Sequence, residues 1–524
     1  MSTRRTVWTG ARLLVGAAAG TNPVSAPPTA LAVEDGLIAY VGSDDQARGW
    51  AGAGVEVVDL GGRLVTPAFV DAHVHLVQTG QTMSGVDLGG ARSRVEVLDR
   101  VAAYVRIHPG VRVVVGQGWD EGEWADQRRP ERAELDRAGG GLPVYLARVD
   151  VHSAVVSSAL LDQLPGIAGA AGYSAAGWMS QDAHHLCRAQ VDRLFTDDER
   201  RASIRAALRE AARQGIGTVH ELGGLHLGPV EDLVRAREVG AEVGVDVVAY
   251  WGELYGEESV ARARAVGAVG LAGDLCIDGA IGSRTAALRQ PYADAQTSGV
   301  RYLSTAEVTE HVVGCSRAGL QAGFHCLGDD AVAAAVDGFR AAAEIVGSPA
   351  VRAARHRLEH VEMVAEADIA TLADLGVVAS MQPAFDAAWG GPGELYERRL
   401  GRARATGMNP LGALHRAGVP LAFGSDSPVT PLNAWTTVRA ALRHGQPNQR
   451  LSFDAALDAA TRGAHWAARD DRAGTLTSGS LASFAVWEDA PVGFGAPGEQ
   501  LDALPRCVRT VSRGRTTFDV AAAG

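Results

Sequence analysis

The chain has 524 residues and a formal net charge of −12; 47% of its residues are hydrophobic and 21% are charged. That apolar fraction is enough for a large core and excludes a disordered or collagen-like chain. The negative charge argues against a nucleic-acid partner held through phosphate contacts. No stretch reaches the roughly 18 apolar residues of a membrane-spanning helix, so we expect no membrane partner either.

All 49 basic residues are arginine, and the chain contains no lysine. This excludes a Schiff-base lysine, a phosphate-loop lysine and a carboxylated lysine that bridges two metal ions, because a guanidinium stays protonated and cannot replace them. The five cysteines are odd in number and widely spaced, without a CxxC pair. They indicate reduced thiols and a cytoplasmic protein.

The first residues resemble a twin-arginine signal, but Arg12 interrupts the short apolar run over 11–20, and we expect no signal peptide. Short β-type runs follow, with a hairpin turn predicted at Glu34–Gly36. Similar runs return near the other end of the chain. Neither end is apolar enough to form its own core. Residues 1–66 and 467–524 are therefore predicted to pair into one composite β-sandwich.

Residues 67–466 alternate apolar strand-like runs with amphipathic helices, the pattern of a parallel sheet flanked by helices. Ten runs are candidate strands, and a (β/α)8 barrel needs eight. They begin near residues 68, 111, 143, 217, 245, 275, 322, 357, 377 and 420. We assign the runs at 111 and 143 to an insertion at about 80–210, which leaves eight strands for an α/β fold of the TIM-barrel type.

Metal-ligand residues stand at the carboxyl ends of several predicted barrel strands. The first strand ends in His73 and His75, which share a face because residues i and i+2 of a strand point the same way. Two neutral imidazoles so placed form half of a site for zinc or a similar ion. Later strands end in His325, His360 and Asp426. In a barrel these ends share one rim, so the sequence predicts a divalent-metal site there.

With these residues the chain resembles the amidohydrolase superfamily, and within it the YtcJ-like branch that includes N-substituted formamide deformylases. The resemblance runs over essentially the whole chain, although Ser483 stands where the branch usually has an aspartate. The motifs that carry it are Thr66–His75, Gly118–Trp124, Arg148–His152, Ile277–Ala286, His325–Asp329, Arg357–His360, Ser380–Pro383 and Gly424–Pro428.

The resemblance implies a distorted TIM barrel with a composite β-sandwich, and hydrolysis by water activated on one or two divalent ions, zinc first among them. Four histidines would be metal ligands, unless one of the last two polarises the substrate instead: His73, His75, His325 and His360. Asp426 would bind metal and act as general base, then as proton donor to the leaving nitrogen. Relatives often dimerise, so a homodimer is expected.

At the position of the bridging ligand, this chain has a different residue from many relatives. Many YtcJ-like chains have a lysine four residues before the Asp278–Gly279 pair, where this chain has Asp274. Three arrangements stay open: a bridge by Glu221, a bridge by Asp274, and a single-metal site without a bridge. Cys276 could supply a thiolate, although a small buried residue is the simpler interpretation.

Four substrate-binding candidates lie outside this set. Arg148 and His152 end an apolar run; Arg148 either forms a buried ion pair with Asp150 or reaches the substrate together with His152. Arg284, on a glycine-rich loop, suits a carboxylate or carbonyl group. Trp119 either lines an apolar pocket at the barrel mouth or packs in a core.

The chain is therefore expected to hydrolyse an amide, formamide or cyclic amide C–N bond in a small, partly apolar molecule. A deaminase or isomerase would need the same metal and base, and stays an alternative. A third hypothesis is a non-catalytic ligand-binding or regulatory protein on the same scaffold. The intact set of four histidines and Asp426 argues against it.

Overall fold

The computed structural model describes residues 5–15, 27–52, 54–490, 494 and 501–523. Part of the apolar run considered as a signal, residues 16–20, lies outside the described residues. Within the described ranges, no helix has both the length and the apolar character needed to cross a membrane.

Eight strands form the central parallel sheet, in the order β19–β18–β17–β16–β15–β14–β13–β7. The sheet nearly closes, because the chain after β19 meets β7: Asp426 N donates to His73 O (2.8 Å) and His75 N donates to Ser427 O (3.0 Å). The predicted distorted (β/α)8 barrel is confirmed. The strands are β7 (Phe69–Val74), β13 (Ile216–Gly224), β14 (Asp246–Gly252), β15 (Gly270–Leu271), β16 (Gln321–Cys326), β17 (Arg357–His360), β18 (Val378–Met381) and β19 (Leu421–Phe423).

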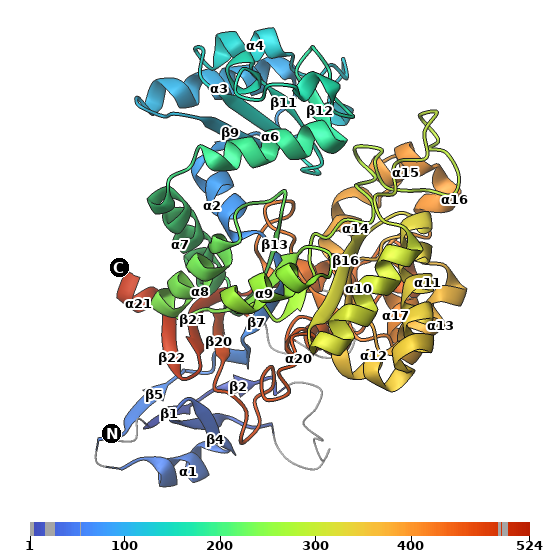
Figure 1. Ribbon diagram of the computed structural model, residues 1–524. Helices are drawn as coiled ribbons and strands as arrows, with labels where there is room; N and C mark the ends of the chain where they lie inside the picture. The colour runs from blue at the N-terminus through green and yellow to red at the C-terminus, as the bar shows by residue number, and fades with distance from the viewer. Residues whose placement is uncertain (1–4, 16–26, 53, 491–493, 495–500, 524) are drawn as a thin grey trace.

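Helices cover the outside of the barrel (Figure 1). Two of them, α7 and α10, begin in capping boxes, Thr196 with Glu199 and Ser304 with Glu307, which satisfy the first free backbone N–H groups. The main covering helices are α2 (Leu76–Ser84), α7 (Asp197–Arg213), α8 (Glu231–Val243), α9 (Glu257–Val266), α10 (Thr305–Ala318), α11 (Asp329–Val346), α12 (Ser348–Ala354), α13 (Glu366–Leu375), α17 (Leu411–Arg416), α18 (Ala434–Leu442), α19 (Phe453–Ala459) and α20 (Arg462–Ala467).

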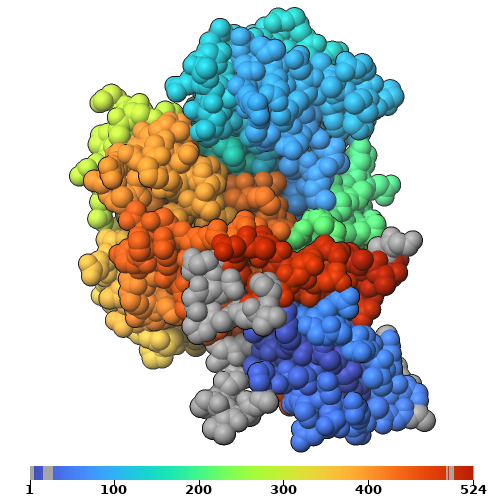
Figure 2. Space-filling model, turned by 180° about the vertical axis from the view of Figure 1, so that it is seen from behind, coloured from blue at the N-terminus to red at the C-terminus, as the bar shows by residue number. Residues whose placement is uncertain are grey.

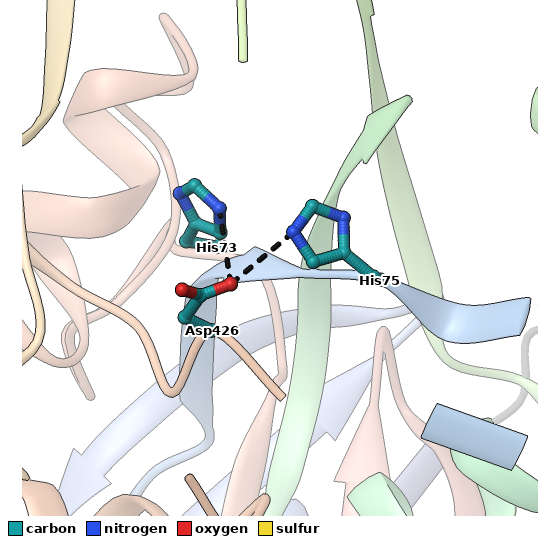
Figure 3. A group of neighbouring side chains, drawn as sticks. All are labelled: His73, His75 and Asp426. Carbon is teal, nitrogen blue, oxygen red and sulfur yellow. Dashed lines mark ion pairs between the residues drawn. The ribbon is translucent and has the colours of Figure 1, made fainter. Parts of the chain in front are cut away.

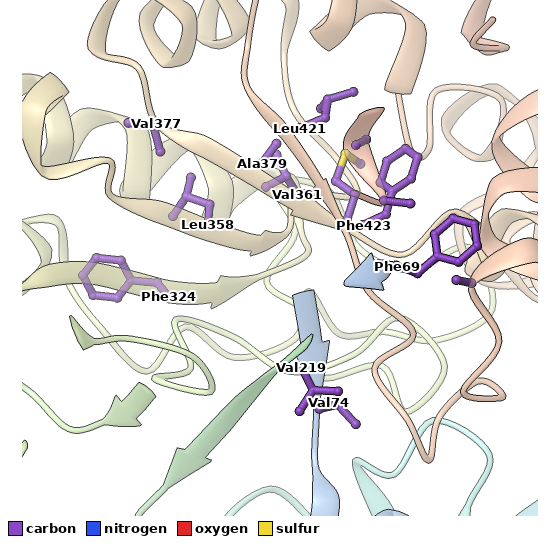
Figure 4. Packing of buried hydrophobic residues seen from close by; sticks show 14 of the residues in the cluster. Phe69, Val74, Val219, Phe324, Leu358, Val361, Val377, Ala379, Leu421 and Phe423 are labelled. Carbon is purple, nitrogen blue, oxygen red and sulfur yellow. The ribbon is translucent and has the colours of Figure 1, made fainter. Parts of the chain in front are cut away.

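The barrel core is formed by strand and helix residues that lie far apart in the chain (Figure 4). Phe69 of β7 meets Trp435 of α18 edge to face, with ring centroids 4.8 Å apart. Phe324 of β16 packs against Phe339 of α11, with centroids 6.3 Å apart. All four rings are at most 2% exposed. Such close packing holds the strand ends in place, and the metal-ligand residues with them.

The strand predicted to begin at residue 275 is misplaced. Strand β15 is only Gly270–Leu271, and Cys276 joins the sheet through a single bridge to His325. The chain turns at Gly273, where φ is +100° and a Cβ would lie 2.8 Å from the side chain of Leu222. Only glycine fits there, because that backbone conformation and that close approach both exclude a side chain. Asp274 follows directly after this turn.

Strands from both chain ends share a sheet. Strand β20 pairs antiparallel with β6 from the N-terminal side and with β21 from the C-terminal side; Figure 2 shows the two ends in contact. The hairpin turn at Glu34–Gly36 is confirmed. One sheet has the order β4–β3–β1–β5 and the other β2–β6–β20–β21–β22. Their bounds are β1 (Arg5–Thr9), β2 (Arg12–Leu13), β3 (Ala30–Glu34), β4 (Leu37–Gly42), β5 (Glu56–Asp59), β6 (Leu64–Pro67), β20 (Phe484–Glu488), β21 (Arg506–Ser512) and β22 (Arg515–Asp519).

A separate five-stranded sheet, β12–β11–β10–β9–β8, lies between α2 and α7 in the chain and at the top of Figure 1. The runs predicted at 111 and 143 are β9 and β10 of this sheet, whereas α7 packs against the barrel helix α2. The strands of this sheet and the helices that accompany them in the chain are β8 (Val86–Asp87), α3 (Arg94–Ile107), β9 (Val114–Trp119), α4 (Arg132–Ala138), β10 (Val144–Arg148), β11 (Ser153–Val156), α5 (Ser158–Leu161), β12 (Trp178–Ser180) and α6 (Gln181–Arg193).

Candidate metal centre

Three predicted ligands meet at the carboxyl end of the barrel strands (Figure 3). His73 and His75 lie at the end of β7, and Asp426 follows β19. Asp426 Oδ1 is 3.4 Å from His73 Nε2 and 3.2 Å from His75 Nε2. All three side chains are buried. The two imidazoles converge in the structure, as their spacing of two residues on one strand predicted.

Asp274 belongs to the same group. Its carboxylate oxygens lie 3.6 Å from His73 Nε2, 3.4 Å from His75 Nε2 and 3.7 Å from His325 Nδ1. The ligand atoms of Asp274, His73 and His360 also lie within 4.8 Å of one another. We call these six side chains the ligand cluster: His73, His75, Asp274, His325, His360 and Asp426.

The ligand cluster fits a divalent ion. Two ligand atoms about 2.1 Å from a tetrahedral ion are about 3.4 Å apart, close to the separations found here. Three buried atoms that face one another make no hydrogen bond within the described part of the chain: His73 Nε2, Asp274 Oδ1 and His325 Nδ1. Buried polar atoms are rarely left without a hydrogen bond in this way, and a shared cation would satisfy all three.

The second ring nitrogen of each histidine points at an acceptor. His73 Nδ1 lies 2.9 Å from Glu359 Oε2, and His75 Nδ1 lies 3.0 Å from Leu222 O. His360 Nδ1 lies 2.7 Å from Gln382 Oε1, and His325 Nε2 lies 3.3 Å from Gly279 O. Each acceptor places a proton on the nitrogen it faces, so a neutral ring has its lone pair on the nitrogen turned into the cluster. Against the effect of burial, the carboxylates of Asp426 and Asp274 raise the pKa of His73 and that of Asp274 raises the pKa of His325, so without a cation these rings carry a second proton, which metal binding would release.

The charges within the ligand cluster favour ionised carboxylates. Although burial raises it, the neighbouring imidazoles hold the pKa of Asp274 well below its usual value. The pKa of Asp426 is lowered in the same way, against its own burial, first by the charge of His73. Burial and the charge of His325 lower the pKa of His360 to about 3. Ionised carboxylates and a neutral imidazole are the forms that bind cations.

Close backbone packing brings Asp426 beside β7. A Cβ at Gly424 would lie 2.5 Å from His73 N, so only glycine allows this approach. Asp71 Oδ1 accepts hydrogen bonds from His73 N (3.2 Å) and Ser425 N (2.9 Å), which ties the first strand to the last. Asp426 itself has a φ of +53°, a strained conformation of the kind that clusters at functional sites.

Glu221 does not belong to the ligand cluster in the described residues. Its Oε2 accepts a hydrogen bond from Leu76 N (2.8 Å), at the first turn of α2. Cys276 is also outside the cluster; its Sγ lies 3.9 Å from His226 Nε2. Of the two acidic candidates for a bridge, Asp274 has carboxylate oxygens within 3.7 Å of three histidines of the ligand cluster, whereas Glu221 is hydrogen-bonded to the start of α2.

Two substrate-binding candidates are buried within the insertion. Arg148 is 1% exposed and pairs with Glu121 (2.8 Å), Asp150 (3.2 Å) and Asp120. This is the ion-pair alternative of the sequence analysis. Trp119 is fully buried in the insertion and donates to Leu146 O (3.0 Å).

The other two candidates lie closer to the barrel. Arg284 pairs with Asp294 at 2.7 Å and remains partly exposed. His152 is the one of the four that lies beside the ligand cluster, with its ring centroid 5.1 Å from that of His325. Burial and the nearby His325 hold the pKa of His152 well below its usual value, so this imidazole is neutral.

A small cavity of about 30 Å³ lies beside the ligand cluster. Its wall is mostly apolar: Phe385 stacks on His360 with centroids 6.0 Å apart, and Trp389 packs on Phe385 at 4.8 Å. The lining residues are Asp150, His152, Ala280, Ile281, Gly282, His325, Leu327, His360, Glu362, Phe385, Trp389, Leu395, Tyr396, Asp426 and Val429. Phe385 and Trp389 belong to α14 (Pro383–Trp389), and Tyr396 to α15 (Leu395–Leu400).

Sequence reasoning missed the residues that hold the ligands in place. Glu359 lies between His73 and Arg357, both of which hydrogen-bond its carboxylate. Arg357 also donates to Ala72 O (2.7 Å) and stacks on Tyr250. The available signal was the pair of charges, Arg357 and Glu359, beside His360 in a predicted barrel strand, because a fully buried Arg and Glu must pair.

Comparison with known proteins adds a family relationship. A model described as the amidohydrolase family matches residues 56–518. The chain is 27% identical to Protein LONG AFTER FAR-RED 3 of Arabidopsis thaliana, over 87% of this chain and 83% of the relative. It is 24% identical to N-substituted formamide deformylase of Arthrobacter pascens, over 88% and 90%. The structure of an uncharacterized metal-dependent hydrolase from Pyrococcus furiosus superposes with a TM-score of 0.73 and 26% identity, over 92% and 98%.

Proposed function

The chain belongs to the amidohydrolase family and is a metal-dependent hydrolase of C–N bonds, and we propose that its substrate is an amide, formamide or cyclic amide of a small, partly apolar molecule. One observation carries the proposal: buried nitrogen and oxygen atoms of His73, His325 and Asp274, which make no hydrogen bond within the described residues, face one another beside an apolar cavity. The similarity to an N-substituted formamide deformylase over most of both chains supports this bond type.

The proposed ion is zinc, bound by histidine nitrogens and carboxylate oxygens of the ligand cluster. A bound divalent ion would lower the pKa of a water molecule toward about 7 and would polarise a carbonyl group. Asp274 is the proposed bridge if two ions bind, in place of Glu221, because its two oxygens reach toward three histidines. His325 and His360 complete the site.

Asp426 is the proposed proton carrier. It is ionised, lines the cavity and lies beside His73 and His75. Its carboxylate can therefore take a proton from the attacking water and return it to the leaving nitrogen. His152, neutral and also in the cavity wall, is placed to contact the substrate. Phe385 and Trp389 would exclude water around the apolar part of the substrate.

Asp426→Asn tests this role, with Asp337→Asn at an exposed helical position as control. We expect Asp426→Asn to keep one or two equivalents of metal and to lose about 100- to 10,000-fold in hydrolysis. The assay uses N-benzylformamide, N-benzylacetamide and hydantoin, with formate, acetate and N-carbamoylglycine measured as the hydrolysis products and ammonia measured separately so that deamination is distinguished. A metal-free protein with full activity would contradict the proposal.

A homodimer and a cytoplasmic location stay predictions. Light scattering on the purified protein tests the first. Cell fractionation tests the second.

A further inference from the structure

The ligand cluster is closed to molecules much larger than water. None of its six residues is more than 9% exposed, and the cavity beside it has a volume of about 30 Å³. Such a volume holds about one or two water molecules. An amide with an apolar body cannot enter it, so part of the protein has to move before a substrate reaches the site.

The insertion, residues 86–195, is built as a body of its own. Apolar side chains pack on both faces of its sheet, Trp119 with Leu146 in one cluster and Tyr145 with Met179 in the other. Among the described residues, no buried apolar cluster combines side chains of the insertion with side chains of the barrel. Two parts that share no apolar core can move relative to each other.

At the mouth of the barrel the insertion is held by polar contacts. Ser283 Oγ, on a loop after β15, donates to Asp150 Oδ2 (2.7 Å) and lies 2.9 Å from Ser153 Oγ. Gln117 Nε2 donates to Pro428 O (2.9 Å). Water can replace each of these partners when the two surfaces separate, so breaking the contacts costs little free energy.

The base of the insertion lies beside a large cavity. The chain enters the insertion after Gly85 and leaves it before Thr196, at the start of α7. Gly85 and Phe195 line a cavity of about 310 Å³, together with Gly80 of α2 and Ala206 of α7. The two crossings are therefore not enclosed in a close-packed core, and the insertion has room to turn about them.

From these observations we infer that the insertion is a lid over the metal site. It turns about the two crossings and separates from the loop that contains Ser283, which uncovers the ligand cluster. When it closes, it returns His152 to its place beside His325, with ring centroids 5.1 Å apart, and excludes bulk water from the site. The inference rests on the proposed function only in that metal and substrate enter at the ligand cluster.

A disulfide between the insertion and the barrel tests the lid. The two Oγ atoms of Ser153 and Ser283 are close enough that the double variant Ser153→Cys/Ser283→Cys can form one. On the metal-loaded protein, cross-linking about nine-tenths of the chains should lower kcat/KM for N-benzylformamide about 10-fold, because only the remaining chains open. A reductant should restore the activity. Each single cysteine variant, oxidised in the same way, controls for the five native cysteines.

Removal of the metal by a chelator gives a second measurement, which does not require turnover. Pyridine-2,6-dicarboxylate should extract metal about 10-fold more slowly from the oxidised double variant than from its reduced form. Ser283→Ala removes both serine contacts at the mouth and should make extraction faster than in the wild type. Ser478→Ala, at an exposed turn far along the chain, is the control and should leave the extraction rate unchanged.

A disulfide confirmed by mass spectrometry that changes neither hydrolysis nor extraction would overturn the inference. If the disulfide does not form, an unchanged extraction rate in Ser283→Ala overturns it. If oxidation slows extraction but neither form hydrolyses any compound, the proposed function fails and the lid stands. If both forms hydrolyse N-benzylformamide equally fast, the lid fails and the proposed function stands.

Discussion

Glu359 Oε2 lies 2.9 Å from His73 Nδ1, at the base of the ligand cluster. Both side chains are completely buried, and Arg357 holds the same carboxylate from its other side. Although burial raises it, the charge of Arg357 and the hydrogen bond from His73 hold the pKa of Glu359 far below its usual value. The contact places a proton on His73 Nδ1 and turns its Nε2 toward the other side chains of the ligand cluster.

Glu359→Gln should therefore weaken metal binding by about 10- to 100-fold. The glutamine oxygen would turn to Arg357 and its NH2 group to His73 Nδ1, which would move the histidine proton onto the nitrogen that binds metal. Competition with a chelator measures the affinity, with Glu366→Gln as control. Unchanged affinity would mean that Glu359 serves only to pair with Arg357.

Asp274→Asn and Glu221→Gln distinguish the two acidic candidates for a bridge. The amide introduced by Asp274→Asn cannot offer two anionic oxygens to the site, so this variant should lower the bound metal or its affinity at least about 10-fold. Glu221→Gln should retain metal, because Glu221 instead accepts a hydrogen bond at the start of α2. Elemental analysis after dialysis measures the metal that each variant retains. Greater metal loss in Glu221→Gln than in Asp274→Asn would favour Glu221 as the bridge.

Arg148→Met should destabilise the protein by about 3–5 kcal/mol without removing metal. The substitution leaves Asp120, Glu121 and Asp150 without their cation in a buried site. Arg284→Met is the matched control, because its pair with Asp294 is partly exposed and should contribute less than about 1 kcal/mol. Urea unfolding followed by fluorescence compares them. Equal losses in the free energy of unfolding of the two variants would show that burial does not distinguish the two ion pairs.

The buried ring of His356 should make the folded protein less stable in acid. Its Nδ1 accepts from Ala322 N (2.8 Å) and its Nε2 donates to Ser316 Oγ (2.8 Å), so the buried ring is neutral. Burial lowers the pKa of His356 to about 3. The unfolded chain therefore binds more protons than the folded one below about pH 6.5. The stabilisation is complete above that pH and is lost as the pH falls.

Between pH 8 and pH 5 this one residue should account for about 2 kcal/mol of lost stability. His356→Leu should be less stable than the wild type at pH 8, because it leaves Ala322 N without an acceptor, but its stability should fall less steeply with acid. Denaturant titrations at a series of pH values measure the two slopes. Parallel slopes would exclude His356 as a source of the acid sensitivity.

Much of the fold and half of the site could be predicted because their signals are local. The alternation of apolar runs with helices indicates a parallel barrel, and the spacing of His73 and His75 places both rings on one face whatever surrounds them. The role of Arg148 was not decidable in this way. Whether it meets Asp150 or a substrate depends on the position of the whole insertion.

By itself, then, the sequence determined the barrel, the absence of a lysine bridge and the histidine pair on the first strand. Only the tertiary structure showed that Asp274 lies within 3.7 Å of three histidines of the ligand cluster, whereas Glu221 accepts a hydrogen bond at the start of α2. The physical reason is that side-chain direction along one strand follows from backbone geometry, whereas the distance between carboxylates on different strands depends on where the chain turns. Here one turn at Gly273 ends β15 early, and Asp274 lies beside His73.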